Sequence, residues 1–262
     1  QPFSTQLDRA EAQAELRAKA IPTNGPLGIS PRSVAALPRT DHDTPADLQF
    51  WNGYGCFTKG GRDYFVRLAS GEATPQPWIN VISNGDFGFH VSAEGAGFTW
   101  SRNSRDHHLT PWSNDPVTDR PGETIHLTDL DSGDVFTPFA TLSNRPDARF
   151  EASHTAGASR FTCTDTPLVV EATQIVDPVD PVKITRLVVT NTGPTPRRLR
   201  LYCYAEWAIG NNRDKTAPML RTYESDGILM VENPYSTQFP GRTAFLPSDA
   251  PVSSFTVDRG AF

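Results

Sequence analysis

The residues with the most evident chemistry lie in one polar and aromatic segment, residues 95–116, which reads G-A-G-F-T-W-S-R-N-S-R-D-H-H-L-T-P-W-S-N-D-P. Its two tryptophans offer flat apolar faces that can stack on the C–H faces of pyranose rings. Asparagine, aspartate and arginine side chains can form paired hydrogen bonds with neighbouring hydroxyl groups. The segment therefore predicts a sugar-binding loop with the candidate residues Trp100, Asn103, Ser104, Arg105, Trp112, Asn114 and Asp115.

The same segment also has a structural interpretation. Trp100 and Trp112 would then be core anchors, and the polar residues would build an ordered loop. The adjacent His107 and His108 indicate a surface pair rather than a metal site, because neighbouring side chains of an extended segment point in opposite directions. No metal site is expected in this chain.

Catalysis by this chain alone is not predicted. The sequence contains no G-x-S-x-G, H-E-x-x-H or Walker motif. Glycoside chemistry needs a general acid together with a second carboxylate or an external phosphate. Nothing in the sequence pairs any two of the acidic residues. Glu206, which lies beside Trp207 in a predicted strand, is expected to be a buried structural carboxylate.

Charge and cysteine usage exclude several classes of function. The net charge is −6 and no block of lysine and arginine occurs, so a nucleic acid partner is not expected. No stretch approaches the roughly 20 apolar residues that a membrane helix needs. The cysteines Cys56, Cys163 and Cys203 are odd in number, widely spaced and without a C-x-x-C pair, which favours three buried, unpaired thiols in a reducing compartment.

The chain divides by composition into an N-terminal part, residues 1–47, and a strand-rich domain, residues 48–262. Residues 4–20 are rich in helix formers after Ser4 and Thr5, either of which can cap a helix. Five prolines follow between residues 21 and 48, which is typical of a linker. Residues 253–262 read as a strand still in progress, so the domain is expected to be truncated at its C-terminal end and both ends to be cut from a longer polypeptide.

Alternating segments separated by turn residues predict strands throughout the second part. Turn signals lie at 58–61, 84–86, 131–133 and 192–194. In the segment 197–207, alternate residues Leu199, Leu201, Cys203, Ala205 and Trp207 are expected on one face. The strands are predicted at 63–68, 78–83, 87–92, 123–129, 134–138, 150–154, 159–164, 168–175, 182–191, 197–207 and 228–232. This spacing predicts an all-β fold, a large antiparallel β-sandwich.

Several of these segments together resemble a known family. They read W-N-G-Y-G-C-F-T at 51–58, W-I-N-V-I at 78–82, G-A-G-F-T-W-S-R-N-S-R at 95–105, L-T-P-W-S-N-D-P at 109–116, D-P-V-K-I-T-R-L at 180–187 and A-E-W at 205–207. The set is similar to the N-terminal β-sandwich of glycoside hydrolase family 94, formerly glycosyltransferase family 36, and most similar to the family-94 region of cyclic β-1,2-glucan synthases. The resemblance covers roughly residues 48–262, and Cys56 stands where glycine is expected.

The resemblance implies a supersandwich of the galactose-mutarotase-like type, joined by a helical linker to an (α/α)6 barrel that holds the general acid and inorganic phosphate. No cofactor is then expected in this chain. A loop of the sandwich reaches the substrate pocket in such phosphorylases, sometimes that of a partner subunit, and that role is carried here to 100–115. The implied partners are a β-glucan or oligosaccharide, the rest of the parent enzyme and, as an alternative, a second copy of the chain.

Three functions remain open at this point. The first is a non-catalytic carbohydrate-binding accessory domain of a β-1,2-glucan synthase or β-glucan phosphorylase, and the resemblance implies that such a synthase lies at the cytoplasmic side of the bacterial inner membrane. The second is a structural or dimerisation domain without sugar contact. The third is a free-standing, lectin-like module.

Overall fold

The computed structural model describes residues 48–113, 115, 117–165 and 167–257, all of which fall in one compact unit, Pro31–Phe262. The predicted helix at 4–20, the proline-rich linker and Asn114 lie outside the described residues. Within the described ranges, most of the regular structure is antiparallel strand, which confirms the predicted sandwich.

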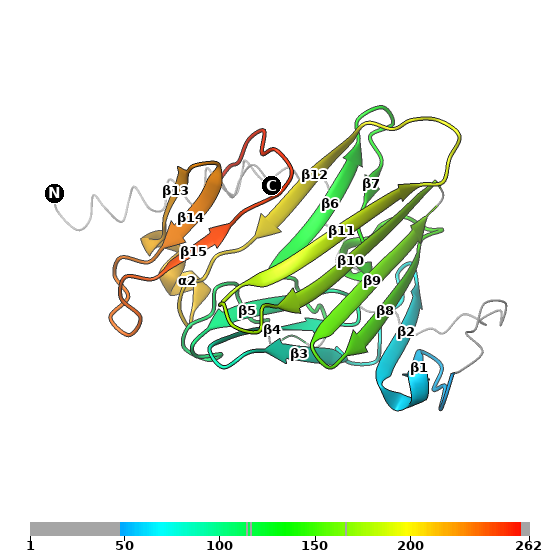
Figure 1. The fold of residues 1–262 in the computed structure, drawn as a ribbon, viewed down its shortest axis with the longest axis horizontal. Coiled ribbons are helices and arrows are strands. Elements are labelled where there is room, and N and C mark those ends of the chain that lie inside the picture. The colour runs from blue at the N-terminus through cyan, green and yellow to red at the C-terminus, as the bar shows by residue number, and fades with distance from the viewer. Residues whose placement is uncertain (1–47, 114, 116, 166, 258–262) are drawn as a thin grey trace, which may run out of the picture. The chain divides into compact units, whose positions relative to one another are not determined.

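The largest layer is a six-stranded antiparallel sheet (Figure 1). Its strands, in spatial order, are β1 (Gly55–Thr58), β2 (Asp63–Ala69), β8 (Arg149–Thr155), β9 (Ala158–Asp165), β10 (Leu168–Val176) and β11 (Lys183–Asn191). In β10 the alternate residues Leu168, Val170 and Ala172 are buried while their neighbours are half-buried, which is the period-two pattern of a strand with one face on a core.

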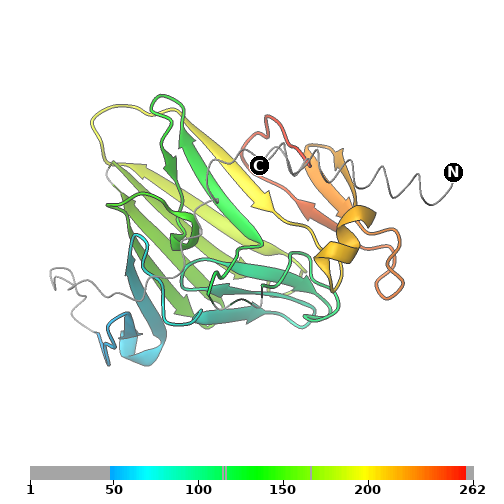
Figure 2. The same ribbon diagram turned by 180° about the vertical axis from the view of Figure 1, so that it is seen from behind.

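Three smaller sheets complete the described structure (Figures 1 and 2). The strands β3 (Ile79–Ser83), β4 (Phe87–Ser92) and β5 (Gly97–Ser101) form one sheet. A second sheet has the order β12 (Leu199–Ala205), β6 (Glu123–Asp129) and β7 (Val135–Phe136). The third is β13 (Arg221–Ser225), β14 (Ile228–Glu232) and β15 (Thr243–Leu246), which follows the one-turn helix α2 (Arg213–Thr216).

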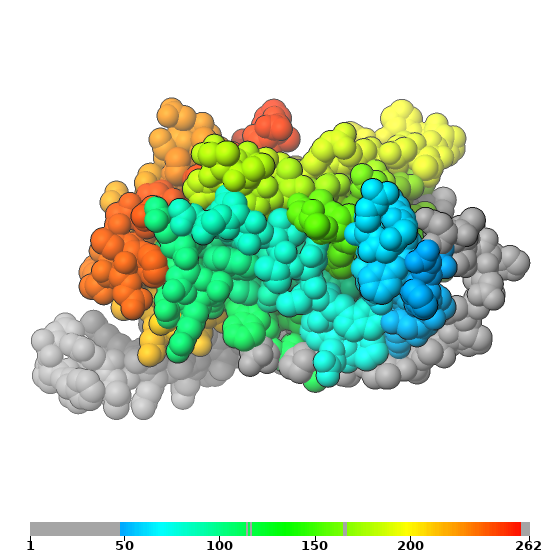
Figure 3. Space-filling model, turned by 60° about the horizontal axis from the view of Figure 1, so that its bottom comes forward, coloured from blue at the N-terminus to red at the C-terminus, as the bar shows by residue number. Residues whose placement is uncertain are grey.

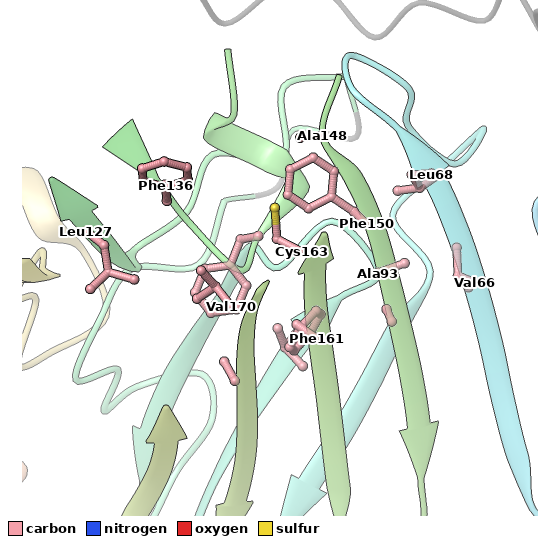
Figure 4. Packing of buried hydrophobic residues seen from close by; sticks show 14 of the residues in the cluster. Val66, Leu68, Ala93, Leu127, Phe136, Ala148, Phe150, Phe161, Cys163 and Val170 are labelled. Carbon is pink, nitrogen blue, oxygen red and sulfur yellow. The ribbon is translucent and has the colours of Figure 1, made fainter. Parts of the chain in front are cut away.

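The main core lies between the six-stranded sheet and the sheets that contain β4 and β6. Figure 4 shows Leu127 and Phe136, from β6 and β7, across from Val170, Phe161 and other side chains of the six-stranded sheet. Full burial of one such side chain stabilises the fold by about 1.5–3 kcal/mol. A separate small cluster of Ile209, Val231 and Ala244 supports the sheet of β13, β14 and β15.

Short polar turns set the register of the hairpins. The Asn84 side chain accepts hydrogen bonds from the backbone N–H groups of Asp86 and Phe87, at 2.9 and 2.8 Å, and so closes the turn between β3 and β4. Asp129 accepts from the N–H of Asp131 at 2.9 Å in the turn after β6. Both turns were expected from the sequence and are confirmed.

Most of the predicted strands are confirmed, and β4, β6 and β14 have the predicted bounds. The strands β1, β5, β13 and β15 do not correspond to any of the predicted ranges. The prediction of a strand at 253–262 is wrong for the described part, since residues up to 257 lie in no strand. Its apolar residues Phe255 and Val257 are more than half exposed, so this segment has no packed face that would hold it in a sheet.

The expectation of three buried thiols is also wrong in one case. All three cysteines are free, but Cys203 is exposed whereas Cys56 and Cys163 are buried. Cys203 and Leu201 pair in register with Ile125 and Leu127 of β6, so they share the core-facing side of that sheet. Because β12 is an edge strand, this end of the core-facing side is uncovered and Leu201 is 37% exposed.

We expect a single thiol to react with Ellman's reagent in the native protein, and we expect it to be Cys203. Burial raises the pKa of Cys163 to about 12, so that buried thiol holds almost no thiolate near neutral pH. Burial also raises the pKa of Cys203, so its reaction should be slower than that of free cysteine.

The absorbance of released thionitrobenzoate measures how many thiols react in the native protein, and it is compared with the three thiols that react in denaturant. Cys203→Ser is the matched control and should abolish the native reaction. Rapid reaction of a second thiol would show that the core around Cys56 or Cys163 opens readily.

Candidate functional site

The candidate loop connects β5 to β6, two strands that lie in different sheets. Arg102 follows β5 with a φ of 68°, and the Asn103 side chain then accepts hydrogen bonds from the N–H groups of Arg105 and Asp106, both at 2.9 Å. The His107 N–H donates to the Asn103 carbonyl at 3.0 Å and the Ser101 N–H to the His107 carbonyl at 3.2 Å. Residues 101–108 therefore form a tight, hydrogen-bonded tip.

Two buried histidines hold the base of this tip, so the predicted surface pair is wrong. His107 is 1% exposed and stacks on Phe239 with ring centroids 4.3 Å apart, while its Nδ1–H donates to the Ser101 carbonyl at 2.9 Å. The His108 Nε2–H donates to the Ser104 carbonyl at 2.6 Å. Two residues that are distant in sequence lie against this pair, Phe239 against His107 and Gly210 against His108.

A carboxylate from β6 fastens the loop to the sheets. The Glu123 carboxylate accepts hydrogen bonds from the hydroxyl of Thr99 in β5 and, at 2.8 Å, from that of Thr110 in the loop. Lys183 of β11 donates to its other oxygen at 2.9 Å. The Lys183 ammonium also lies 4.3 Å from the centroid of the Phe89 ring, which is a cation–π contact.

The titratable groups around this carboxylate have displaced pKa values. Burial opposes ionisation of Glu123, but Lys183 and the two threonine hydroxyls hold its pKa below the usual value. Burial, with a smaller contribution from Lys183, lowers the pKa of His90 to about 4. Burial also lowers the pKa of His107 and of His108. The loop therefore rests on neutral imidazoles and one ionised, paired carboxylate near neutral pH.

The two candidate tryptophans lie beside the same phenylalanine but differ in exposure. Trp100 is half-buried, and a Cβ atom at Gly88 would lie 2.5 Å from its ring, so Trp100 packs closely on the backbone of β4. Its ring centroid lies 5.3 Å from that of Phe98. Trp112 is 52% exposed, with its centroid 6.3 Å from that of Phe98. Only Trp112 offers a broad free surface.

The polar candidates also differ in whether their side chains are exposed and free or already hydrogen-bonded within the loop. Asn103, Ser104 and Arg105 are exposed at the tip, where the Asn103 side chain is already engaged in the turn. Asp115 accepts hydrogen bonds from the Val117 N–H at 2.9 Å and the Thr118 hydroxyl at 2.7 Å. The Arg105 guanidinium forms no ion pair with Asp115, and no side-chain partner of Arg105 occurs among the described residues. Asn114 lies outside them.

The expected burial of Glu206 is confirmed. Its side chain is 10% exposed and its carboxylate pairs with Arg213 at 3.2 Å and Arg120 at 3.8 Å. Over the described ranges, no three His, Cys, Asp or Glu side chains gather in the manner of metal ligands. In the same part of the chain, no helix is long and apolar enough to cross a lipid bilayer.

The sequence did not identify Glu123, Lys183 or Phe239 as parts of this site. Glu123 begins β6 and Lys183 begins β11, 60 residues further along the chain, and Phe239 belongs to an irregular segment after β14. The motifs at 95–105 and 180–187 contain Thr99 and Lys183, but a single sequence gives no sign that the two residues share a carboxylate.

Comparison with known proteins bears on this arrangement of sheets and loop. A sequence model described as the supersandwich domain of glycosyl hydrolase 94 matches residues 62–262, most of the chain. The chain belongs to glycosyl hydrolase family 94. The resemblance inferred from the motifs is thereby confirmed.

Individual family-94 relatives are synthases and phosphorylases. The chain is 54% identical over 218 residues to the cyclic beta-(1,2)-glucan synthase NdvB of Rhizobium meliloti (strain 1021), covering 82% of this chain and 8% of the synthase. It is 24% identical over 219 residues to an N,N'-diacetylchitobiose phosphorylase of Vibrio furnissii, covering 80% of this chain and 27% of the phosphorylase. The chain thus spans a small part of the length of these curated relatives.

We expect the protein to lose stability as the pH falls below about 7, because its described histidines are neutral in the folded state. Burial lowers the folded pKa of His90 and of His154 to about 4, and unfolding restores the usual value of 6.5. Between these two pH values the unfolded state therefore binds more protons than the folded state. At about pH 5.5 each of these two residues should cost roughly 1 kcal/mol of the free energy of unfolding.

Urea denaturation at about pH 7.5 and about pH 5.5 measures the difference in the free energy of unfolding. Both pH values lie above the range in which most carboxylates titrate. His90→Gln should reduce the difference in the free energy of unfolding between the two pH values by roughly 1 kcal/mol, the contribution of one histidine. This holds even if the substitution changes the stability at both pH values. Equal pH dependence in the variant and the parent would contradict the assignment of a depressed pKa to His90.

Proposed function

We propose that this family-94 domain is a non-catalytic, carbohydrate-binding accessory domain of a larger β-glucan enzyme, with the loop at 100–115 forming one wall of the glucan site. The observation that carries the proposal is the combination of an exposed Trp112 ring with the exposed Arg105 guanidinium on a rigid base. An aromatic face and a free donor fork are suited to a sugar ring and its hydroxyls.

The base of the loop supports this function by limiting motion. His107, His108 and Glu123 are all engaged in hydrogen bonds to the loop, so its backbone is already ordered before a ligand arrives. Binding to a preorganised surface avoids the entropy loss of ordering a segment. Trp112 and Arg105 are not needed for these contacts and remain available for a ligand.

The carboxyl groups favour a non-catalytic role. A general acid of glycoside cleavage needs a raised pKa, so that it carries a proton near neutral pH. The described carboxyls with displaced pKa values, Glu123, Asp129, Asp131 and Asp177, are all displaced downward. In this proposal the general acid and inorganic phosphate belong to the rest of the parent enzyme, whose glucan linkage we take from the synthase relative as β-1,2. We place that enzyme at the cytoplasmic side of the inner membrane.

We expect Trp112→Ala and Arg105→Ala to impair the full-length enzyme without unfolding this domain. Loss of the charge-assisted hydrogen bond of Arg105 should cost about 1.5–3 kcal/mol, which is roughly a 10- to 100-fold loss in kcat/KM. Both side chains are exposed, so the melting temperature of the 262-residue chain should change little. Phosphorolysis or synthesis kinetics and thermal melting measure the two effects separately.

Matched controls are Arg160→Ala on the exposed side of β9 and Tyr235→Ala after β14, which remove an exposed cation and an exposed ring elsewhere. Neither control should alter the kinetics. A lowered melting temperature with unchanged kinetics in the loop variants would favour the structural or dimerisation domain instead. If neither quantity moves, the loop has no sugar contact through these residues.

The 262-residue chain alone should not phosphorolyse β-glucans, because the pKa values of Glu123, Asp129, Asp131 and Asp177 are displaced downward, opposite to what a general acid needs. The measurement is release of glucose 1-phosphate from β-1,2-glucan in phosphate buffer, compared with a blank without protein. Release above the blank would overturn the non-catalytic assignment, though not the assignment of the loop.

A further inference from the structure

A segment that follows β14 lies against the candidate loop. It comprises residues 233–241, which connect β14 to β15 without regular structure, and it is called here the clasp segment. Its Phe239 ring stacks on the His107 ring of the loop, with centroids 4.3 Å apart and an interplanar angle of 19°. Figure 3 shows orange atoms of this part of the chain next to green atoms of the part that contains the loop.

The His107 side chain connects the tip of the loop to the clasp segment. Its Nδ1 lies 2.9 Å from the Ser101 carbonyl oxygen, and because a carbonyl can only accept, the hydrogen of the neutral ring lies on Nδ1. The Nε2 atom is buried and has no hydrogen-bond partner among the described residues. The ring is therefore held by a hydrogen bond to the start of the tip and by the stacking contact with Phe239.

The clasp segment is itself anchored by hydrogen bonds. The buried Asn233 side chain donates to the Ile209 carbonyl at 3.1 Å and accepts from the Tyr235 N–H at 3.1 Å. The Ser236 hydroxyl oxygen then accepts from the Phe239 N–H at 3.2 Å. These turns fix the backbone that carries the Phe239 ring.

The anchor residue Ile209 has an unusual backbone conformation. Its φ of 41° is a genuine outlier for a β-branched residue, although the side chain is buried in the small cluster below β14 and β15. Its neighbour Gly210 exchanges two backbone hydrogen bonds with His108, at 3.1 and 3.0 Å, and the Ala208 N–H donates to the Leu109 carbonyl at 2.8 Å. Strain of this kind persists only where surrounding contacts enforce it, and it is concentrated at functional sites. The turn at 208–210 therefore joins the loop and the clasp segment.

We propose that Phe239 is a positioning residue of the glucan site, which acts through His107 to set where the tip at 101–108 holds the Arg105 guanidinium. The hydrogen bonds of Asn103 within the tip fix its shape, but its orientation depends on contacts with other segments. Because Arg105 lies two residues before His107, a tilt of the tip displaces its guanidinium directly, and small displacements of positioning groups are costly. That the guanidinium meets a sugar rests on the proposed function.

A purely stabilising role of Phe239 is the main rival. Over the described part of the chain, Phe239 belongs to neither hydrophobic cluster, including the one formed by Ile209, Val231 and Ala244. Its ring is half-buried and lies on an imidazole of the loop instead. This placement favours positioning of the loop over support of the core.

The first test uses proton NMR of the 262-residue chain. A covered, hydrogen-bonded ring N–H exchanges slowly with water and gives a separate downfield signal, which His107→Gln assigns. Phe239→Ala should remove this signal and should raise the pKa of His107 toward its usual 6.5, because burial is the main cause that lowers it. The nearby Arg242 and His108 also lower this pKa, and both remain in the variant. An unchanged signal and an unchanged titration would overturn the inference.

The second test measures kinetics of the full-length enzyme. Phe239→Ala should raise KM by roughly 2- to 10-fold, because a displaced tip weakens ground-state and transition-state binding alike. Phe239→Tyr keeps the flat ring and should restore the parent KM. In the Arg105→Ala background, Phe239→Ala should have little further effect, since positioning acts through Arg105. Fully additive effects would contradict the proposal.

Two controls separate positioning from a general loss of stability. Tyr235→Ala removes an exposed ring from the same segment and should change neither the His107 signal nor KM. Val170→Ala in the main core should lower the melting temperature and leave the His107 signal in place. Equal loss of the signal in Val170→Ala and Phe239→Ala would overturn the inference.

Failure of this inference is distinct from failure of the proposed function. If Arg105→Ala impairs the kinetics and Phe239→Ala does not, the positioning role is wrong and the sugar-facing loop stands. If neither variant alters the kinetics, the proposed sugar contact is wrong and the positioning role is wrong with it. If Phe239→Ala unfolds the chain, Phe239→Leu decides by the same measurements, because it fills the space without a flat ring.

Discussion

The ion pair between Glu123 and Lys183 joins two sheets of the sandwich, and the same carboxylate also binds β5 and the candidate loop. Glu123 belongs to the sheet of β12, β6 and β7, Lys183 to the edge of the six-stranded sheet and Thr99 to β5, while Thr110 lies in the candidate loop. Loss of either partner of such a buried pair leaves an uncompensated charge, at a cost of about 3–5 kcal/mol. The sandwich layers and the loop therefore depend on the same carboxylate.

This arrangement explains why the loop has a rigid base and a free tip. The base uses neutral, buried imidazoles of His107 and His108, whose partners are backbone carbonyls and aromatic rings. The tip uses its own Asn103 side chain to close a turn, which leaves Arg105 and the ring of Trp112 exposed. The structural interpretation of this segment is thus right for Asn103, His107 and His108, while a role of Arg105 and Trp112 in sugar binding stays a proposal.

Predictions from the sequence were correct for elements that the local residue pattern determines. They were wrong for residues whose burial depends on partners far away in the sequence. The strands β4, β6 and β14 have the predicted bounds because alternation and turn residues determine them. β5 was missed because Gly97, Phe98 and Trp100 were grouped with the polar loop that follows. His107 was assigned to the surface because its cover, Phe239, lies 132 residues further along the chain. Of the candidate site, the loop was found, but the base that holds it requires the pairing of non-consecutive strands.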